Sequence, residues 1–201
     1  MSKVTCDIGI SVDGFAAGPN QRLEEPLGDG GERLHRWMFE EQEANAEEIA
    51  KITSAGAYIM GRHMFGPDRG PAWNPDWTGW WGEEPPYHAP VFVLTHHPRE
   101  SVVMKGGTTF HFVTDGIESA LARAREAAGD RDVSIAGGAS TVNQYLAAGR
   151  IEELRLHIAP VVLGEGERLF EGVGDLALEP VDVTRTPLVT HVTYRVGGPR
   201  G

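Results

Sequence analysis

The sequence has little of three things: cysteine, basic residues and long apolar runs. Cys6 is the single cysteine, which excludes an internal disulfide framework and predicts a buried thiol in an apolar strand. Lysine and arginine number 18 against 29 aspartates and glutamates, a formal net charge of -11, which argues against a nucleic-acid partner because phosphate backbones require a basic face. No stretch is long enough to span a membrane, and the N-terminus lacks the apolar run of a signal peptide. We therefore expect a cytoplasmic protein with no membrane partner.

The remaining composition is that of one globular domain. The chain has 201 residues, of which 40% are hydrophobic and 23% charged. This length suffices to bury a core of good size. The chain contains no internal repeat, low-complexity tract or dividing linker, so we predict a single domain over residues 1–201.

The hydrophobic pattern alternates between strands and helices. Strands are expected at Val4–Val12, Gly56–Met60, Val91–Leu94, Phe110–Val113, Val133–Ala136, Ile151–Ile158, Leu178–Thr184 and Val189–Val196. Helices are expected at about 32–54, at Ile117–Ala128 with Gly129 as its stop, and from Gly138 to near Gly149. This order predicts an α/β fold with a mainly parallel twisted sheet, flanked by helices, and with antiparallel strands at the C-terminal edge.

The acidic segment Glu40-Glu41-Gln42-Glu43 interrupts the apolar stripe of the first helix. It is either the solvated face of one continuous helix or a break between two helices, and we favour the solvated face.

The pair Gly137-Gly138 is the most informative local motif. It follows the apolar run Val133–Ala136 and precedes an amphipathic helix, the order in which a backbone can approach a phosphate. Ser140 and Thr141 can cap the first helical turn or add hydroxyl donors. The alternative is a plain strand-to-helix turn.

Two other segments follow predicted strands directly, Gly61-Arg62-His63-Met64 and Thr95-His96-His97-Pro98-Arg99. Ligands of parallel sheets bind at the carboxyl ends of the strands. We therefore expect these two segments and Gly137–Thr141 to meet at one edge and form a basic pocket for a phosphorylated ligand.

The stretch 67–90 contains four tryptophans in a Pro- and Gly-rich loop. We expect them to pack on the domain or on a dimer partner rather than over a ligand.

Three further patterns do not indicate sites. Gly172-Val173-Gly174-Asp175-Leu176-Ala177 has the letters of a dinucleotide fingerprint, but no apolar strand precedes it and no helix is expected after it. Gly28–Gly31 reads as a loop. The pair His96-His97 lacks a third ligand nearby in sequence, so we expect no metal.

Five segments in the same order resemble the dihydrofolate reductase-like fold, specifically the bacterial reductases similar to the C-terminal domain of the bifunctional riboflavin-biosynthesis deaminase/reductase. They are Ser11–Ala17, Ile59–Phe65, Val93–Thr95, Ile135–Thr141 and Ile151–Gly166.

The resemblance implies an oxidoreductase that binds NADPH, of the dihydrofolate reductase or 5-amino-6-(5-phosphoribosylamino)uracil reductase type. Gly137, Gly138, Ala139, Ser140 and Thr141 would hold the pyrophosphate, and Gly61, Arg62 and Met64 the phosphates and ribose. Thr95 and His96, with Arg99, would surround the 2′-phosphate, and Leu94 beside them would also contact the cofactor. Asp13–Ala17, with Ala17 in contact, would lie beside the nicotinamide as a mobile loop.

The catalytic acid is not identified by these motifs. Asp13 is a weak candidate, since an Asp-Gly turn explains it equally well, and Asp29 and Glu32 are better explained as acids near a helix start. We expect reduction of a small heterocyclic, pterin- or aminopyrimidine-like compound. The alternative is a non-catalytic nucleotide-binding protein that keeps the pocket for structure or sensing. Relatives of this kind pair, so a homodimer is expected.

Overall fold

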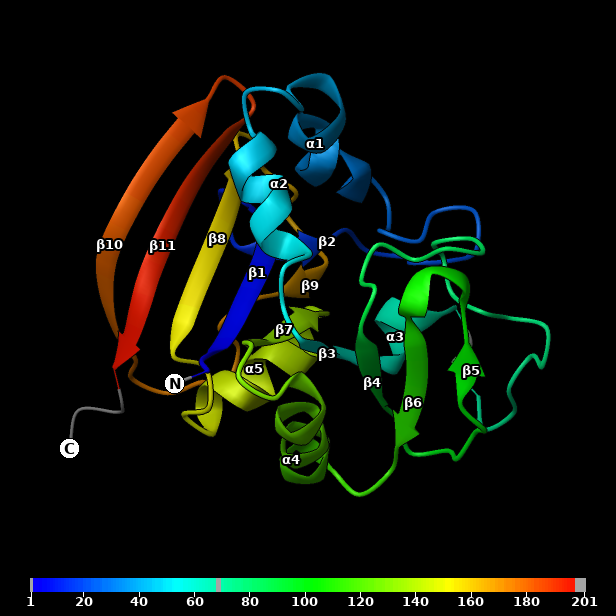
Figure 1. The fold of residues 1–201 in the computed structure, drawn as a ribbon. Helices are drawn as coiled ribbons and strands as arrows, with labels where there is room; N and C mark the ends of the chain where they lie inside the picture. The colour runs from blue at the N-terminus through cyan, green and yellow to red at the C-terminus, as the bar shows by residue number, and fades with distance from the viewer. Residues whose placement is uncertain (1, 68–69, 198–201) are drawn as a thin grey trace.

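The computed structural model describes residues 2–67 and 70–197, which form a large sheet covered by helices on both faces (Figure 1). The strands are β1 (Val4–Ser11), β2 (Phe15–Ala17), β3 (Ala57–Gly61), β4 (Pro90–Leu94), β5 (Val102–Val103), β6 (Thr109–Val113), β7 (Val133–Gly137), β8 (Glu153–Ala159), β9 (Glu167–Arg168), β10 (Ala177–Thr186) and β11 (Val189–Gly197). The helices are η1 (Gly31–His35), α1 (Arg36–Glu40), α2 (Ala46–Ile52), α3 (Arg62–Phe65), η2 (Lys105–Gly107), α4 (Ile117–Ala128) and α5 (Ala139–Ala147).

The main sheet has nine strands in the order β10-β11-β8-β1-β7-β3-β4-β6-β5. The six strands from β8 to β6 are parallel, whereas β11, β10 and β5 are antiparallel to their neighbours. The predicted α/β class, with a parallel centre and an antiparallel C-terminal edge, is confirmed. The short strands β2 and β9 form a separate pair that the sequence pattern did not indicate.

Side chains alternate between the two faces of the sheet, so each strand contributes to two different environments. On β3, Ala57 and Ile59 join a core with helices α4 and α5, whereas Tyr58 and Met60 join a second cluster on the opposite face. Cys6 lies in the first core and is fully buried, as expected, and burial raises the pKa of its thiol.

The second cluster is covered by the tryptophan-rich segment. Trp73, Trp77 and Trp81 pack against it, and the indole N–H groups of Trp73 and Trp77 donate to the carbonyl oxygens of His97 (3.1 Å) and Phe65 (2.9 Å). The prediction that the tryptophans pack on the domain is confirmed for these three residues.

The acidic segment is a break between two helices, so the favoured prediction of one continuous helix was wrong. Helix α1 ends at Glu40 and α2 begins at Ala46. Tertiary hydrogen bonds explain the break. The buried Asn45 side chain donates to the carbonyl oxygen of Glu41 (2.9 Å), and the Glu41 carboxylate accepts from the backbone N–H of Leu188 (3.2 Å) and from the hydroxyl of Thr186. The segment is thereby anchored to the β10–β11 turn.

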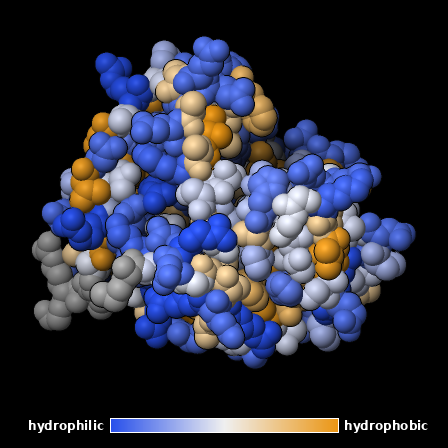
Figure 2. Space-filling model, in the orientation of Figure 1, coloured by the Kyte–Doolittle hydropathy of each residue, from blue (hydrophilic) through white to orange (hydrophobic). Residues whose placement is uncertain are grey.

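Strand β10 forms one edge of the sheet, and its residues are mostly exposed, including Val181 and Val183. Its pairing with β11 shifts register between Pro180 and Asp182. The face shown in Figure 2 is largely hydrophilic, with small separate hydrophobic areas. Among the described helices, none has the length and apolar character needed to cross a membrane.

We predict that the folded protein loses stability as the pH falls from 6.5 to 4.5. Burial, aided by nearby His157, lowers the pKa values of His35 and His191 from 6.5 to about 4. In this window the unfolded chain binds more protons than the folded chain, so each histidine costs up to about 1.4 kcal/mol per pH unit. Urea denaturation at several pH values should show this slope, and His191→Gln should reduce it. A free energy of unfolding that does not change across the window would contradict the prediction.

Candidate active site

A cavity of about 1000 Å³ opens at the carboxyl ends of β3, β4 and β7 and continues between the sheet and helices α1 and α2. All three predicted ligand segments border it, which confirms that they meet at one edge of the sheet. Apart from Arg99, its lining includes the residues expected to contact the cofactor, namely Ala17, Gly61, Arg62, Met64, Leu94, Thr95, His96, Gly137, Gly138, Ala139, Ser140 and Thr141.

The Gly137-Gly138 pair joins β7 to α5 and leaves the helix start uncovered. Gly137 has a φ of 131°, a conformation that favours glycine, and a Cβ added at Gly138 would meet no atom within 4 Å. No side chain caps α5, so the hydroxyls of Ser140 and Thr141 do not act as caps here. The intrahelical bonds begin with the N–H of Thr141, and the N–H groups of Ala139 and Ser140 precede them. This geometry suits an anion.

Gly61 lies against the first turn of α5. A Cβ at this position would come within 2.5 Å of Oγ1 of Thr141, so the close approach of β3 to α5 requires glycine. The loops that follow β3 and β7 are therefore packed directly on one another.

Arg62 begins the short helix α3 and is largely buried beneath the tryptophan segment. Its guanidinium stacks on the Trp73 ring, 3.9 Å from the centroid, and donates to the carbonyl oxygen of Ala72 (3.0 Å). Stacking and hydrogen bonding fix the arginine at the cavity wall.

The residues that follow β4 lie in two different environments. Thr95 is buried, and its hydroxyl accepts from the backbone N–H of His97 (3.1 Å), which shapes the turn, whereas His96 is exposed. Arg99, expected beside them, is not among the described residues that line the cavity. Its guanidinium donates to the carbonyl oxygen of Trp77 (2.6 Å) and lies over the rings of Trp73 and Phe112. The expected role of Arg99 in the pocket is therefore corrected to a role in holding the tryptophan segment.

The segment Asp13–Ala17, expected to be a mobile loop, is mostly strand β2, which pairs with β9. Ala16 and Ala17 line the cavity, but the described lining does not include Asp13. The Asp13 carboxylate accepts from the backbone N–H groups of Leu163 (3.1 Å) and Gly164 (2.7 Å). Hydrogen bonds from Ser11 and from these two N–H groups lower its pKa from 3.8 to about 2. A carboxyl so difficult to protonate is a poor proton donor, and the structure identifies Asp13 as the anchor of a turn.

Asp29 and Glu32 also lie outside the described lining of the cavity. Asp29 is bound to Asn20 (2.9 Å) and Arg22 (2.6 Å) at the surface, and Glu32 is an exposed residue in the first turn of η1. Their interpretation as acids near a helix start remains the better one.

The two rival glycine motifs are loops, as predicted. Gly172 and Gly174 have φ values of 69° and 75°, and strand β10 rather than a helix follows them. Gly28 and Gly30 both have a φ of 74° and form the turn that leads into η1. Within residues 2–67 and 70–197, no group of three or more potential metal ligands occurs.

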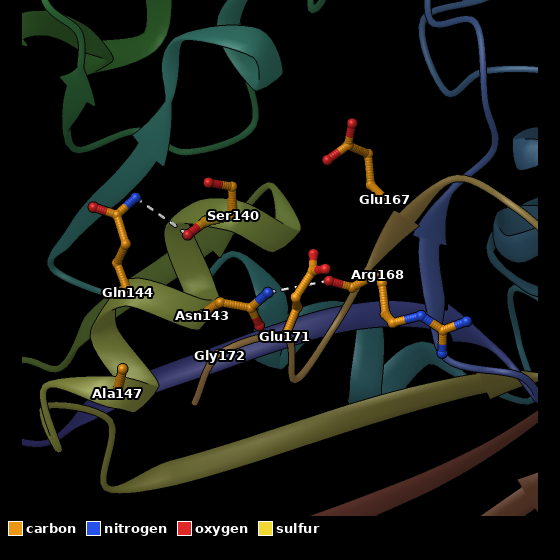
Figure 3. Close-up of a pocket in the computed structure, with 8 residues that line it drawn as sticks. All are labelled: Ser140, Asn143, Gln144, Ala147, Glu167, Arg168, Glu171 and Gly172. Carbon is orange, nitrogen blue, oxygen red and sulfur yellow. Dashed lines mark hydrogen bonds between the residues drawn. The ribbon is translucent and has the colours of Figure 1, made fainter. Parts of the chain in front are cut away.

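A smaller pocket of about 250 Å³ lies between α5 and β9 (Figure 3). Asn143 closes its base by donating to the carbonyl oxygen of Arg168 (3.1 Å). The Arg168 guanidinium is engaged elsewhere, over the Phe15 ring and on the carbonyl oxygen of Asp13. Because the guanidinium of Arg168 is turned to these partners, the charged groups left to the pocket are the carboxylates of Glu167 and Glu171. Their negative charge makes the pocket unsuited to a phosphate.

The part of the large cavity that lies between the sheet and helices α1 and α2, called the far half below, was not predicted from the sequence. It is lined by Asp7, Gly9, His35, Trp37 and His157, which come from β1, η1, α1 and β8. The sequence signal available for this half of the cavity was Asp7, a charged residue within the apolar strand β1. In β8 the polar residues Glu153, Arg155 and His157 alternate with Leu154, Leu156 and Ile158, a pattern typical of a half-exposed strand. Helices α1 and α2, however, cover the face that carries His157.

The model of the RibD C-terminal domain family matches residues 2–192. The uncharacterized protein YyaP of Bacillus subtilis is 23% identical over 172 residues, which cover 84% of this chain and 80% of that protein.

Two solved structures share the fold. A Shewanella sp. PV-4 protein provisionally assigned to riboflavin biosynthesis has a TM-score of 0.67 and 22% identity, with 98% of this chain and 99% of that chain covered. The Thermotoga maritima diaminohydroxyphosphoribosylaminopyrimidine deaminase/5-amino-6-(5-phosphoribosylamino)uracil reductase has a TM-score of 0.59 and 15% identity, with 96% of this chain and 56% of that chain covered.

We predict that Gly61→Ala destabilises the protein by about 1–3 kcal/mol, because the new methyl group overlaps the Thr141 hydroxyl. Adding Thr141→Ala removes that oxygen, and the double variant should recover about 1 kcal/mol relative to the sum of the single variants. Chemical denaturation of the four proteins measures this coupling. Gly70→Ala, where an added Cβ meets no atom within 4 Å, is the control and should change stability little. Additive effects would show that the contact does not set the spacing of β3 and α5.

Proposed function

Because the chain belongs to the RibD C-terminal domain family, we propose that it is an NADPH-dependent reductase that transfers a hydride to a small heterocyclic compound. The observation that carries the proposal is the meeting of three segments, remote in sequence, around one cavity: Gly61–Met64, Leu94–His96 and Gly137–Thr141. Family membership supports a reductase role in general. The use of NADPH as cofactor and the heterocyclic class of the substrate are proposals that go beyond family membership.

The residues present fit a dinucleotide phosphate. The uncapped start of α5 and the bare backbone at Gly138 suit a pyrophosphate, which needs N–H donors and close approach. We assign Arg62, Gly61 and Met64 to the phosphates and ribose. Thr95 and the exposed His96, beside Leu94, lie where a 2′-phosphate would find a hydroxyl and an imidazole.

The bound nicotinamide supplies the hydride, and the protein supplies placement, exclusion of water and a proton route. Ala16 and Ala17 on β2 give the nicotinamide a small, apolar neighbour. Trp80 and Trp81 also line the cavity and keep water from it, so the tryptophan segment contributes to the site as well as to the core.

Fluorescence titration with NADPH and NADH, followed by NADPH oxidation against a panel of aminopyrimidines and pterins, tests the proposal. We expect tighter binding of NADPH than of NADH, and turnover of at least one compound of the panel. Binding without turnover across the panel would favour a non-catalytic nucleotide-binding protein. No binding of either nucleotide would reject the proposal.

His96→Ala should weaken NADPH binding about 10-fold more than NADH binding, because it removes a group assigned to the 2′-phosphate that only NADPH carries. Arg62→Ala removes a group assigned to the phosphates and ribose that both nucleotides share, so it should weaken the binding of both. Arg131→Ala and His88→Ala remove exposed residues of the same types outside the described lining of the cavity, and should leave both affinities unchanged. Equal losses of NADPH and NADH affinity in His96→Ala would place the 2′-phosphate elsewhere.

We also propose that two copies of the chain associate in solution, as expected from the family resemblance. Light scattering coupled to size-exclusion chromatography should give twice the 21.8 kDa mass of the chain. A single-chain mass at micromolar concentration would reject this assembly.

A further inference from the structure

His157 lines the far half of the cavity and has one ring nitrogen that its neighbours do not bind. It lies on β8, in register with Gly9 of β1, and its side chain is 2% exposed. In the part of the chain that the structure describes, Nε2 of His157 has no hydrogen-bond partner. A buried polar atom without a partner is costly, which indicates that this nitrogen serves a molecule in the cavity.

The other ring nitrogen of His157 belongs to a chain of hydrogen bonds that fixes its tautomer. Because the Asn45 amide nitrogen donates to the carbonyl oxygen of Glu41, its oxygen faces Nε2 of His191 at 2.9 Å. Nε2 of His191 therefore carries the hydrogen, and its Nδ1 accepts. In the 2.7 Å contact between the two Nδ1 atoms, the hydrogen then belongs to His157. Nε2 is thus the atom at which neutral His157 can take up a proton.

The surroundings of this histidine pair favour a proton on Nε2 of His157 over one on His191. Nε2 lies 3.6 Å from the carboxylate of Asp7, so an added N–H would meet negative charge, which Arg155 partly offsets from 3.2 Å on the same carboxylate. A proton on Nδ1 of His191 would instead set two N–H groups against each other. His157 can therefore gain and lose a proton while the chain of hydrogen bonds is kept.

The other described titratable groups near the pair are neutral or already paired. Burial, aided by the charge of His157, lowers the pKa of His35 on η1 to about 4, so His35 is neutral at pH 7. On α2, Glu48 and Lys51 lie near His191 and bind each other at 2.6 Å. The contact from α1 is the uncharged ring of Trp37, whose centroid lies 5.2 Å from that of His157. The exchangeable proton of this cluster thus resides on His157.

His157 also lies within reach of the nicotinamide end of the proposed cofactor site. On β1, Cys6 is in register with Ile135 of β7. Further along β1, Gly9 is in register with His157, which is therefore level with the end of β7. Strands β7, β1 and β8 are neighbours, so His157 is two strand spacings, about 10 Å, from the loop assigned to the pyrophosphate. The nicotinamide half of a dinucleotide can cross such a distance.

We propose that His157 is the proton-transfer residue of the reduction, and that His191 and Asn45 are positioning residues that hold its tautomer. Reduction of a C=N or C=O bond adds a hydride from NADPH to the carbon and a proton from Nε2 of His157 to the nitrogen or oxygen. The imidazolium becomes a neutral imidazole in this step and regains a proton from solvent, so each turnover consumes one NADPH and one proton. The assignment rests on the proposed function, because it requires a reductase.

The tautomer is tested by NMR of the full chain with isotopically labelled histidine and NADP⁺, at a pH high enough to keep His157 neutral. The hydrogen of His157 should lie on Nδ1 and that of His191 on Nε2. Both rings are identified by their contacts with Trp37, so the measurement needs no variant. In His191→Gln, whose amide can either donate or accept, both tautomers of His157 should appear. A hydrogen on Nε2 of neutral His157 in the wild-type protein would overturn the proposal.

Kinetics tests the transfer itself, with NADPH and a pterin or aminopyrimidine that the wild-type protein reduces. The wild-type kcat should fall as the pH rises, because the acid loses its proton. His157→Gln should lower kcat about 100-fold or more and remove this pH dependence, while the affinity for NADPH is unchanged. His88→Gln is the control and should change neither, since His88 is exposed and lies outside the described lining of the cavity.

The possible failures are distinguishable. If His157→Gln keeps its rate, or loses rate but keeps the wild-type pH dependence, His157 is not the proton donor and the reductase assignment stands. If the wild-type protein reduces no compound, the proposed function and the role of His157 fail together. Should His157→Gln not fold, the wild-type protein decides the matter by a comparison of two titrations. The pH at which NMR shows His157 losing its proton must match the pH at which kcat falls, and a mismatch rejects the assignment.

Discussion

The parallel pairing of β7 between β1 and β3 is the interaction on which the rest of the structure depends. Strand β7 ends at the same level as β3, because Gly137 of β7 is in register with Met60 of β3. The two strands therefore deliver Gly61 and Gly138 to the same place, and the Thr141 hydroxyl fills the space that a side chain at Gly61 would need. Backbone hydrogen bonds thus position a site whose residues are more than seventy positions apart in sequence.

Short-range patterns were sufficient for most of this framework. The helix Ile117–Ala128 was predicted with its observed limits, because its inward residues repeat at helical spacing and Gly129, with a φ of 61°, ends it. The glycine pair was recognised because a strand precedes it and a helix follows. What could not be predicted depends on contacts between distant segments. The break after Glu40 results from hydrogen bonds to Thr186 and Leu188. The position of Arg99 results from its packing on the rings of Phe65, Trp73 and Phe112, which come from three other segments.

The half of the sheet beneath α1 and α2 departs from the usual apolar packing of a helix on a sheet. Asp7, Arg155, His157 and His191 all lie on that face, and Asn45 reaches them from the start of α2. Periodicity predicts which face of a strand a residue occupies, but it does not tell whether that face meets water or a helix. This is why the alternation of β8 suggested an exposed histidine where the folded chain buries one.

The irregular edge strand β10 also affects how the protein behaves at high concentration. A long, flat outer strand is a template for pairing with another chain. Here Pro180 has no backbone N–H to donate, and the register shift beside it bends the ladder. Glu179, Asp182 and Arg185 add charge on the same strand. These features oppose growth of the sheet from one molecule into the next, so the protein is protected against fibrous aggregation along the edge where Val181 and Val183 are exposed.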